Sequence, residues 1–548
     1  MSQQEPELTW QSKLIIGKQP HWLATKVIFV IFVALAAVSW DFWDKRNESQ
    51  INKILSRSPE LVRLAATDRE GLENVEAWLR ALVISGKSYG ALKAARMIGN
   101  ADHRSRVMAS IVEALAKAGK ADEAQQVASE ALKTARRVED AYSRYYAMAR
   151  IVEALAMCGK SEEALEVARR IEGGVYRSRA MVSVVEALAK TGKMDEAQQV
   201  AGEALKTAHT TGEADVRSRA MANIVEALAK GGKVDEALQL AGEAIETARM
   251  IVDLDYRSQA MGHIVEALAK AGRMGEALET ARIIVDADTR TKATVIANRS
   301  RAIVSVAEAQ AKTGKMDEAR QVAFEALGTA RMIDDAVPRA QAMVNVIEAL
   351  TMAGKTDEAQ RVAGEALETA HGIGDAHSRS YAMAIIVEAL AQAGKTDEAL
   401  GTAYGIGDAD YRFRAMVRVV EALAKAGKID EALETARRVE HADLRSQAMV
   451  IVAEVMTKNR EAGKARSALD VAQRDAQQAT KNSEKSTRLA AVAIGLARLH
   501  HYRLARETAD LCASPGDKLA AYTAIFREYI IERNPQLEPP FKKEEEQK

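Results

Sequence analysis

An all-α solenoid of antiparallel helix pairs is predicted for this chain from three observations. One sequence pattern returns ten times between Arg104 and Glu454, and its clearest copies read RSRAMVSVVEALAKTGKMDEA and RSRAMANIVEALAKGGKVDEA. Aromatic residues make up 4% of the sequence and prolines number only 8 among 548 residues, a composition that favours helices. Each unit is too small to bury an apolar face of its own, so neighbouring units must stack into one elongated array.

The first expected element is one N-terminal transmembrane helix. Residues 27–40, VIFVIFVALAAVSW, carry no charge, and the segment reaches 22 residues when it is taken from Trp22 to Trp43. As a helix this segment is about 33 Å long, enough for a hydrocarbon core of about 30 Å. The expected order is an N-terminal tail at 1–21, a membrane anchor at 22–43 and a linker at 44–58.

The same segment has a second interpretation. A cleaved signal peptide with its apolar core at residues 27–39 would make the protein secreted rather than a single-pass membrane protein. Bulky aromatic residues follow this core where cleavage needs small ones, and this favours the anchor. Lysine and arginine flank both sides of the segment, so the positive-inside rule does not decide its orientation.

The repeated unit predicts two helices, A and B. In the unit that opens at Arg217, apolar residues follow at Met221, Ile224, Val225 and Leu228, which marks one face of a helix. A glycine fifteen places after the arginine, present in nine of the ten units, predicts the end of helix A, because a left-handed cap costs glycine nothing. Asp-Glu-Ala then opens helix B with carboxylates at its positive end. The opening arginines are Arg104, Arg144, Arg177, Arg217, Arg257, Arg299, Arg339, Arg379, Arg412 and Arg445.

Unit length varies in a regular way. Successive arginines are 33 residues apart in three cases, 40 in five and 42 in one. The common difference of seven residues is two helical turns. We therefore expect helix B to lengthen without turning its apolar stripe away from the core.

The pattern resembles the tetratricopeptide repeat family over roughly residues 60–515. The glycine between the helices (Gly232) and the alanines five and twelve places after it (Ala237 and Ala244) match that family. The chain departs from the family in carrying Met221 where a tryptophan is usual and in lacking the closing proline. The resemblance implies a right-handed superhelix whose A helices line a concave groove that holds peptides or partner helices.

The opening arginine is expected to be structural. It lies in line with the buried stripe of helix A. We expect each arginine to bind a carboxylate, such as Asp215 beside Arg217, or the carbonyl ends of the preceding helix B. Ligand binding is the alternative, but a recognition residue need not be identical in every unit.

Charged residues line another side of helix A. Glutamate stands nine places after the arginine in all ten units, and lysine follows four places later in seven, a favourable helical spacing. The alternative interpretation is a solvated face whose ion pairs are each worth a few tenths of a kcal/mol. By the resemblance this is the groove side, and side chains that depart from the pattern are expected to add specific contacts. The candidate partner-binding residues are Arg219, Glu226, Lys230, Glu266 and Lys270, together with Tyr146 and Tyr381.

Nothing in the sequence predicts catalysis, a cofactor or a metal site. The nine histidines are scattered and no H-E-x-x-H or paired C-x-x-C occurs. Cys158 and Cys512 are expected to be free thiols. Lysine plus arginine equal aspartate plus glutamate at 77 each, which removes the bulk electrostatic argument for nucleic acid.

Weaker units are expected to cap both ends of a solenoid at 59–532. The opening unit, 59–98, has Glu76 at the glutamate position, Gly86 at the cap and Trp78 filling the end. The closing unit is 484–532, and a disordered tail is expected at 533–548.

These features predict a membrane-anchored scaffold that binds a protein or peptide through its superhelical surface without catalysis. One alternative is a self-associating structural spacer. A less favoured alternative is an RNA-binding helical repeat, which the repeated glutamates oppose because they repel phosphate.

Overall fold

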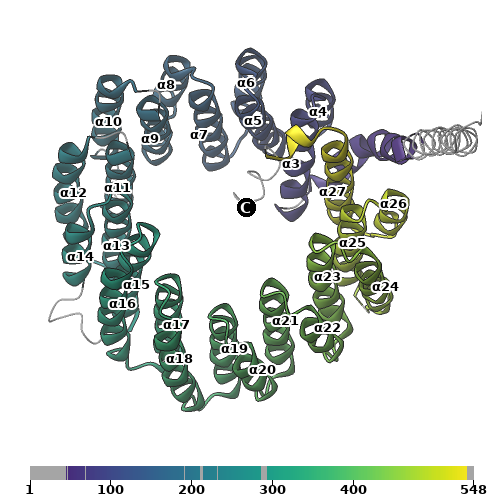
Figure 1. Ribbon diagram of the computed structural model, residues 1–548. Coiled ribbons are helices and arrows are strands. Elements are labelled where there is room, and N and C mark those ends of the chain that lie inside the picture. Colours follow the sequence, from purple (N-terminus) through teal and green to yellow (C-terminus); the bar gives the residue numbers. More distant parts are fainter. Residues whose placement is uncertain are drawn as a thin grey trace, which may run out of the picture. The chain divides into compact units, whose positions relative to one another are not determined.

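The computed structural model of the protein is all-helical in the part of the chain that it describes (Figure 1). The chain divides into two units, Met1–Ser58 and Pro59–Lys548. In the first unit, residues 47–58 are helical, within the segment expected as a linker. The described residues are 45, 47–67, 69–190, 192–209, 214–230, 233–284, 293–479 and 481–539.

In the second unit, A helices and B helices alternate along the chain. Each A helix packs against the next A helix and against the B helix that follows it, as the stacking prediction requires. The A helices are α3 (Arg69–Ile84), α5 (Ala101–Lys117), α7 (Ala141–Met157), α9 (Gly174–Lys190), α11 (Ala214–Lys230), α13 (Leu254–Lys270), α15 (Ala293–Lys312), α17 (Ala336–Met352), α19 (Ala376–Gln392), α21 (Ala409–Lys425), α23 (Ala442–Lys458), α25 (Asn482–Arg498) and α27 (Pro515–Arg533).

The B helices alternate with them and come in two lengths. Six have 9 residues and the others 15 to 17, so the predicted two-turn extension of helix B is confirmed for the 33- and 40-residue units. The short ones are α4 (Ser88–Arg96), α8 (Ser161–Arg169), α14 (Met274–Arg282), α20 (Thr396–Tyr404), α22 (Ile429–Arg437) and α26 (Tyr502–Asp510). The long ones are α6 (Ala121–Ala135), α10 (Met194–His209), α12 (Val234–Arg249), α16 (Met316–Arg331), α18 (Thr356–His371) and α24 (Ala462–Gln478).

Small and medium side chains fill the core between A and B helices. Met221, Ile224 and Val225 of α11 are fully buried, as the periodicity predicts, and Ala237 and Ala244 are buried on α12, which packs against α11. Small residues let the helix axes approach closely. The unit therefore needs no tryptophan. The methionine in its place instead accepts a weak hydrogen bond from a threonine of helix B, as between Thr247 Oγ1 and Met221 Sδ at 3.7 Å.

The ends of the helices carry the expected signals. Gly119, Gly354 and Gly427 are left-handed, with φ between 69° and 78°, and each ends an A helix. Five of the A helices, α7, α13, α17, α19 and α21, open at an aspartate whose side chain accepts backbone N–H groups, as Asp375 Oδ2 does from Ser378 at 2.7 Å. Such caps fix where each A helix begins, and therefore where its surface residues lie.

The array of the second unit closes on itself. Helix α3 packs against α27 as extensively as consecutive A helices pack against each other. Trp78 and Phe526, both fully buried, meet there edge to face with ring centroids 5.3 Å apart. Figure 1 shows the result as a ring with the A helices in its inner row and the B helices in its outer row. The two terminal units were expected to cap the array separately; the structure shows that they cap each other.

The single-pass membrane localisation expected from the sequence is corrected here. No helix in the described ranges is both long and apolar enough to cross a bilayer. The described helices are amphipathic; α15, 20 residues long, carries Arg299, Arg301, Glu308 and Lys312. The predicted anchor itself, residues 22–43, lies outside the described residues.

The predicted C-terminal tail differs from the structure in its first part. After α27 ends at Arg533, residues Pro535–Leu537 form a short 3-10 helix that contacts α27. The remainder of that prediction, residues 540–548, lies outside the described residues.

Candidate partner-binding face

The inner face is our name for the side of the A helices that the B helices leave uncovered. In α19 it consists of Tyr381, Ile385, Glu388 and Gln392, all half-buried or exposed. The equivalent residues of the other A helices follow from the same helical spacing. Because the A helices form the inner row, this face lines the opening of the ring (Figure 1).

A row of glutamates runs along the inner face over ten consecutive A helices, α5 to α23. Contacts between neighbouring helices join its members. Lys270 of α13 lies 3.3 Å from Glu226 of α11 and 3.0 Å from Glu266 of its own helix. Further along, Arg418 of α21 lies 3.5 Å from Glu388 of α19. The row is Glu113, Glu153, Glu186, Glu226, Glu266, Glu308, Glu348, Glu388, Glu421 and Glu454.

The charge of this row is compensated unevenly. Although burial acts to raise it, the pKa of Glu113 is lowered by its hydrogen bond with Lys117 and by the charges of Lys117 and Arg150. Glu348 differs, because the inner face of α17 carries Gln341, Asn345 and Met352 and no cation. Burial and the neighbouring carboxylates of Glu308 and Glu388 raise the pKa of Glu348. Around Glu348 the row therefore carries a negative charge that no cation of the inner face of α17 compensates.

The structure places some of the predicted partner-binding residues together. Glu226, Glu266 and Lys270 form one ion-paired group on α11 and α13. Tyr146 is half-buried on α7, and Tyr381 is 39% exposed on α19, on the other side of the ring. The side chains of Arg219 and Lys230 lie outside the described part of the chain. That these residues contact a partner stays a prediction.

Glu76 does not stand at the glutamate position of the repeat, contrary to the prediction. In the regular units the glutamate stands six residues before the cap glycine, so Gly86 makes Arg80 the equivalent residue in α3. Glu76 lies one turn earlier and is only 5% exposed. Weak periodicity in this terminal unit left the register open, and the left-handed Gly86 fixes it.

Glu76 is the centre of a buried ionic cluster that sequence reasoning missed. Its carboxylate accepts a hydrogen bond from Arg106 Nε at 2.7 Å, and Arg150 Nη1 lies 3.4 Å away, so helices α3, α5 and α7 are tied together. Arg80 contacts Glu76 at 3.5 Å and donates to Ser110 Oγ at 2.7 Å. Since a buried carboxylate needs such partners, this cluster is structural.

Several opening arginines hold the connection between two units in place by hydrogen bonds to its backbone. Arg379 Nη1 donates to the carbonyl oxygens of Ile373 at 2.7 Å and Gly374 at 3.3 Å, just after helix α18 ends. Arg104, Arg144, Arg412 and Arg445 bind the matching carbonyls, which likewise lie in the connection just after the preceding B helix. A cation at this position therefore satisfies backbone carbonyls of the connection between one unit and the next.

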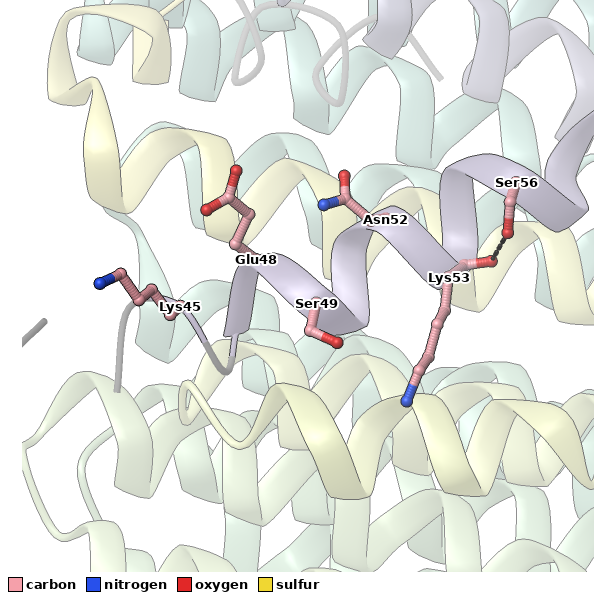
Figure 2. A pocket seen from close by; sticks show the side chains of 6 residues that line it. All are labelled: Lys45, Glu48, Ser49, Asn52, Lys53 and Ser56. Atoms are coloured by element: carbon pink, nitrogen blue, oxygen red, sulfur yellow. Dashed lines mark hydrogen bonds between the residues drawn. The ribbon is translucent and has the colours of Figure 1, made fainter. Parts of the chain in front are cut away.

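Other parts of the described surface offer little chemistry. A shallow depression runs along a single helix of the first unit and is lined by Lys45, Glu48, Ser49, Asn52, Lys53 and Ser56 (Figure 2). All six side chains come from consecutive turns of that helix, so the depression is the surface of one helix. Within the described ranges, no three His, Cys, Asp or Glu side chains are grouped to hold a metal ion.

No protein-family model matches the chain, and no curated protein matches its sequence. The solved structures that match the chain include the following three. A Rap protein complexed with competence and sporulation factor is 14% identical over 77% of this chain and 99% of its own, with a TM-score of 0.23. Human IFIT1, solved as a dimer, is 12% identical over 77% and 99%, with a TM-score of 0.26. The third is a signal-transduction ATPase with a tetratricopeptide repeat sensor from Pyrococcus horikoshii, 12% identical over 74% and 62%, with a TM-score of 0.27.

At such TM-scores these likenesses carry no argument about function, and the class of protein rests on the units themselves. The units are helix pairs, and nine of those in the described residues have a left-handed glycine between their helices and buried alanines on helix B. Units pack mainly on their neighbours. The chain is a helical-repeat protein whose units resemble tetratricopeptide repeats.

Proposed function

We propose that this protein is a non-catalytic scaffold that binds a protein partner through the inner face of its A helices. The observation that supports this most is the incompletely compensated row of glutamates. Burial and the like charges of Glu113 and Glu186 raise the pKa of Glu153, as burial and two neighbouring carboxylates do for Glu348. Like charges on adjacent helices destabilise the fold. Residues that lower the stability of a fold are expected at functional sites.

Two further features support a protein rather than a small molecule as the ligand. The inner face is continuous over many helices, and extended surfaces of stacked repeats suit extended partners. It also mixes carboxylates with exposed apolar groups, since Met157 and Met352 are 42% and 41% exposed. Methionine adapts its shape to partner surfaces.

The test compares two charge reversals in the full-length chain. The inner variant carries Glu308→Lys and Glu348→Lys. The matched outer variant carries Glu243→Lys and Glu368→Lys, two exposed glutamates on B helices α12 and α18. Each chain is immobilised and bound proteins are identified by mass spectrometry, after circular dichroism has shown equal helicity.

A partner that the wild type and the outer variant retain, and the inner variant loses, supports the proposal. Equal recovery of that partner by all three chains overturns it. Recovery of copies of this chain alone also overturns it, in favour of a self-associating structural element, which concentration-dependent light scattering would register.

A further inference from the structure

Tyrosines gather at one edge of the inner row of helices. Of the 12 tyrosines in the sequence, seven fall in the first two turns of an A helix. Consecutive A helices pack side by side in parallel, so these first turns share one edge of the row. The seven are Tyr142, Tyr145, Tyr146, Tyr176, Tyr256, Tyr381 and Tyr411.

The first cluster joins α7 and α9. The rings of Tyr142 and Tyr176 meet edge to face with centroids 5.2 Å apart, and Tyr145 lies 6.3 Å from Tyr176. Tyr145 also donates a hydrogen bond to Glu172 Oε2 at 2.9 Å. A side chain at Gly173 would meet the Tyr145 ring at 2.7 Å, so glycine is required there. These contacts hold the rings of the cluster in place, yet Tyr142 remains 67% exposed.

The second cluster joins α19 and α21. Tyr411 meets Tyr381 at a centroid distance of 5.9 Å and His377 at 5.2 Å. The Tyr411 hydroxyl and His377 Nε2 are 3.3 Å apart, and His377 Nδ1 lies 3.8 Å from the carboxylate of Asp408. Figure 1 shows α19 and α21 across the ring from α7 and α9.

Carboxylates stand beside both clusters. Asp140 opens α7, Asp375 opens α19 and Asp408 opens α21. Hydrogen bonds from Ser143 and Ser378 lower the pKa values of Asp140 and Asp375, so both are charged at neutral pH. These aspartates offset the positive end of the helix dipole, which would otherwise disfavour a cation there.

We infer that the two tyrosine clusters bind cationic side chains, above all arginine, of the protein partner. Tyrosine faces attract cations, and a guanidinium also pairs with carboxylates in two parallel hydrogen bonds. Acidic peptides and nucleic acids meet repulsion from the same aspartates and from the glutamate row. Two clusters on opposite sides of the ring fit a partner with two basic segments. The inference rests on the proposed function, since it specifies the chemistry of that partner.

Tests use the full-length protein and a fluorescein-labelled peptide of alternating arginine and serine, with glutamine replacing arginine in a comparison peptide. Fluorescence anisotropy at physiological ionic strength reports binding. Tyr381→Leu with Tyr411→Leu removes the aromatic faces of one cluster, and Tyr142→Leu with Tyr176→Leu those of the other. The matched control is Tyr89→Leu on the outer helix α4, where Tyr89 is 78% exposed.

Each double leucine variant is expected to weaken binding of the arginine peptide about tenfold, while phenylalanine at the same positions and Tyr89→Leu leave it within about twofold. Equal binding of the glutamine peptide overturns the inference, and so do leucine variants that bind like the wild type. If either result is found while the Glu308→Lys and Glu348→Lys variant still loses the captured partner, the proposed scaffold function is retained. Only the inference that the partner is basic is then rejected.

Discussion

At the scale of single residues, the turn between helices A and B depends on one left-handed position. Glycine fills it in nine described units, with φ from 69° to 82°. Arg460 and His500 fill it in the two units that follow, with φ of 64° and 58°. A side chain in this conformation is strained, because its Cβ crowds the following carbonyl oxygen. The turns between helices A and B of these two units are therefore predicted to be the most strained in the array.

Arg460→Gly is predicted to stabilise the protein by about 1 kcal/mol, since it removes this strain and Arg460 is exposed. Urea denaturation followed by circular dichroism measures the change. Gly427→Ala serves as the mirror control and is expected to destabilise by a similar amount. An Arg460→Gly midpoint at or below that of the wild type would contradict the role given to this position.

Glu348→Gln is predicted to stabilise the protein at neutral pH, by about 0.5 kcal/mol, the scale of like-charge pairs on helices. Burial, Glu308 and Glu388 raise the pKa of Glu348 in the folded state, so its ionised form is disfavoured there. As the pH falls through this raised pKa, wild-type Glu348 binds a proton and the penalty disappears. The advantage of the variant should therefore shrink between pH 7 and pH values near the ordinary glutamate pKa of about 4.3.

Glu421→Gln is the matched control, because a hydrogen bond from Lys425 lowers the pKa of Glu421. Its wild-type contribution is present above the ordinary glutamate pKa and is lost as the pH falls through the lowered one. The control should thus lose stability at pH 7, and its deficit should close at lower pH than the advantage of Glu348→Gln. Denaturation midpoints that move in the same direction for both variants would refute this account of the glutamate row.

At the scale of the elements, two kinds of arginine join one unit to the next. The opening arginines bind carbonyls in the connection that follows the preceding B helix, as Arg379 does after α18. Arginines on the B helices instead form bidentate pairs with the next B helix, as Arg331 does with Glu365 at 2.7 and 2.6 Å. The first kind is part-buried and fixes the connection between units. The second kind is exposed on the outer side of the ring.

Arg379→Ala is predicted to cost about 1.5–3 kcal/mol, the range for hydrogen bonds that involve a charged group. Arg331→Ala should cost about 1 kcal/mol or less, because solvent screens an exposed pair. Hydrogen exchange of residues 372–378 shows whether the connection next to Arg379 is destabilised, and urea denaturation measures the change in the free energy of unfolding. If Arg331→Ala proved the more costly change, or if Arg379→Ala abolished partner binding at unchanged stability, the interpretation of the opening arginines as structural would fail.

Most of the elements could be predicted from the sequence, because the periodicity of Met221, Ile224 and Val225 and the glycines recur in many copies. The site was predicted only in part. The pair of Glu266 and Lys270 follows from helical spacing within one unit, and Glu226 occupies the equivalent position of the unit before. The clusters around Tyr176 and Tyr411 depend on which side chains neighbouring helices bring together, and one sequence without those contacts does not show it. The cluster around Glu76 was hidden for the same reason.

At the scale of the whole second unit, the interface of α3 with α27 differs from every other interface between described A helices. It joins residues about as far apart in sequence as this unit allows, such as Trp78 and Phe526, and no connecting loop supports it. At Gly516 the approach is so close that an added Cβ would lie 3.2 Å from the Cα of Gly71. Where parallel helices come this near, glycine permits the contact.

Trp78→Ala is predicted to open the ring, because the loss of a buried tryptophan costs about 3–5 kcal/mol at a single interface. Small-angle scattering should show a larger radius of gyration, and hydrogen exchange should rise in α3 and α27. Val346→Ala, at the equivalent core position of α17, should leave the ring closed. Gly516→Leu provides an independent wedge at the same interface. Unchanged scattering for both Trp78→Ala and Gly516→Leu would show that the ring does not depend on this contact.

The closed ring also changes how the array can come apart. A linear stack of repeats has two terminal members, each held by one neighbour, and these fray first. In a circle every member has two neighbours, so the departure of any one requires two interfaces to break together. Without a favoured starting point, melting should involve the whole array at once. For the same reason, a permuted gene that cuts the chain in another connecting loop and fuses residues near α3 and α27 should encode the same circle.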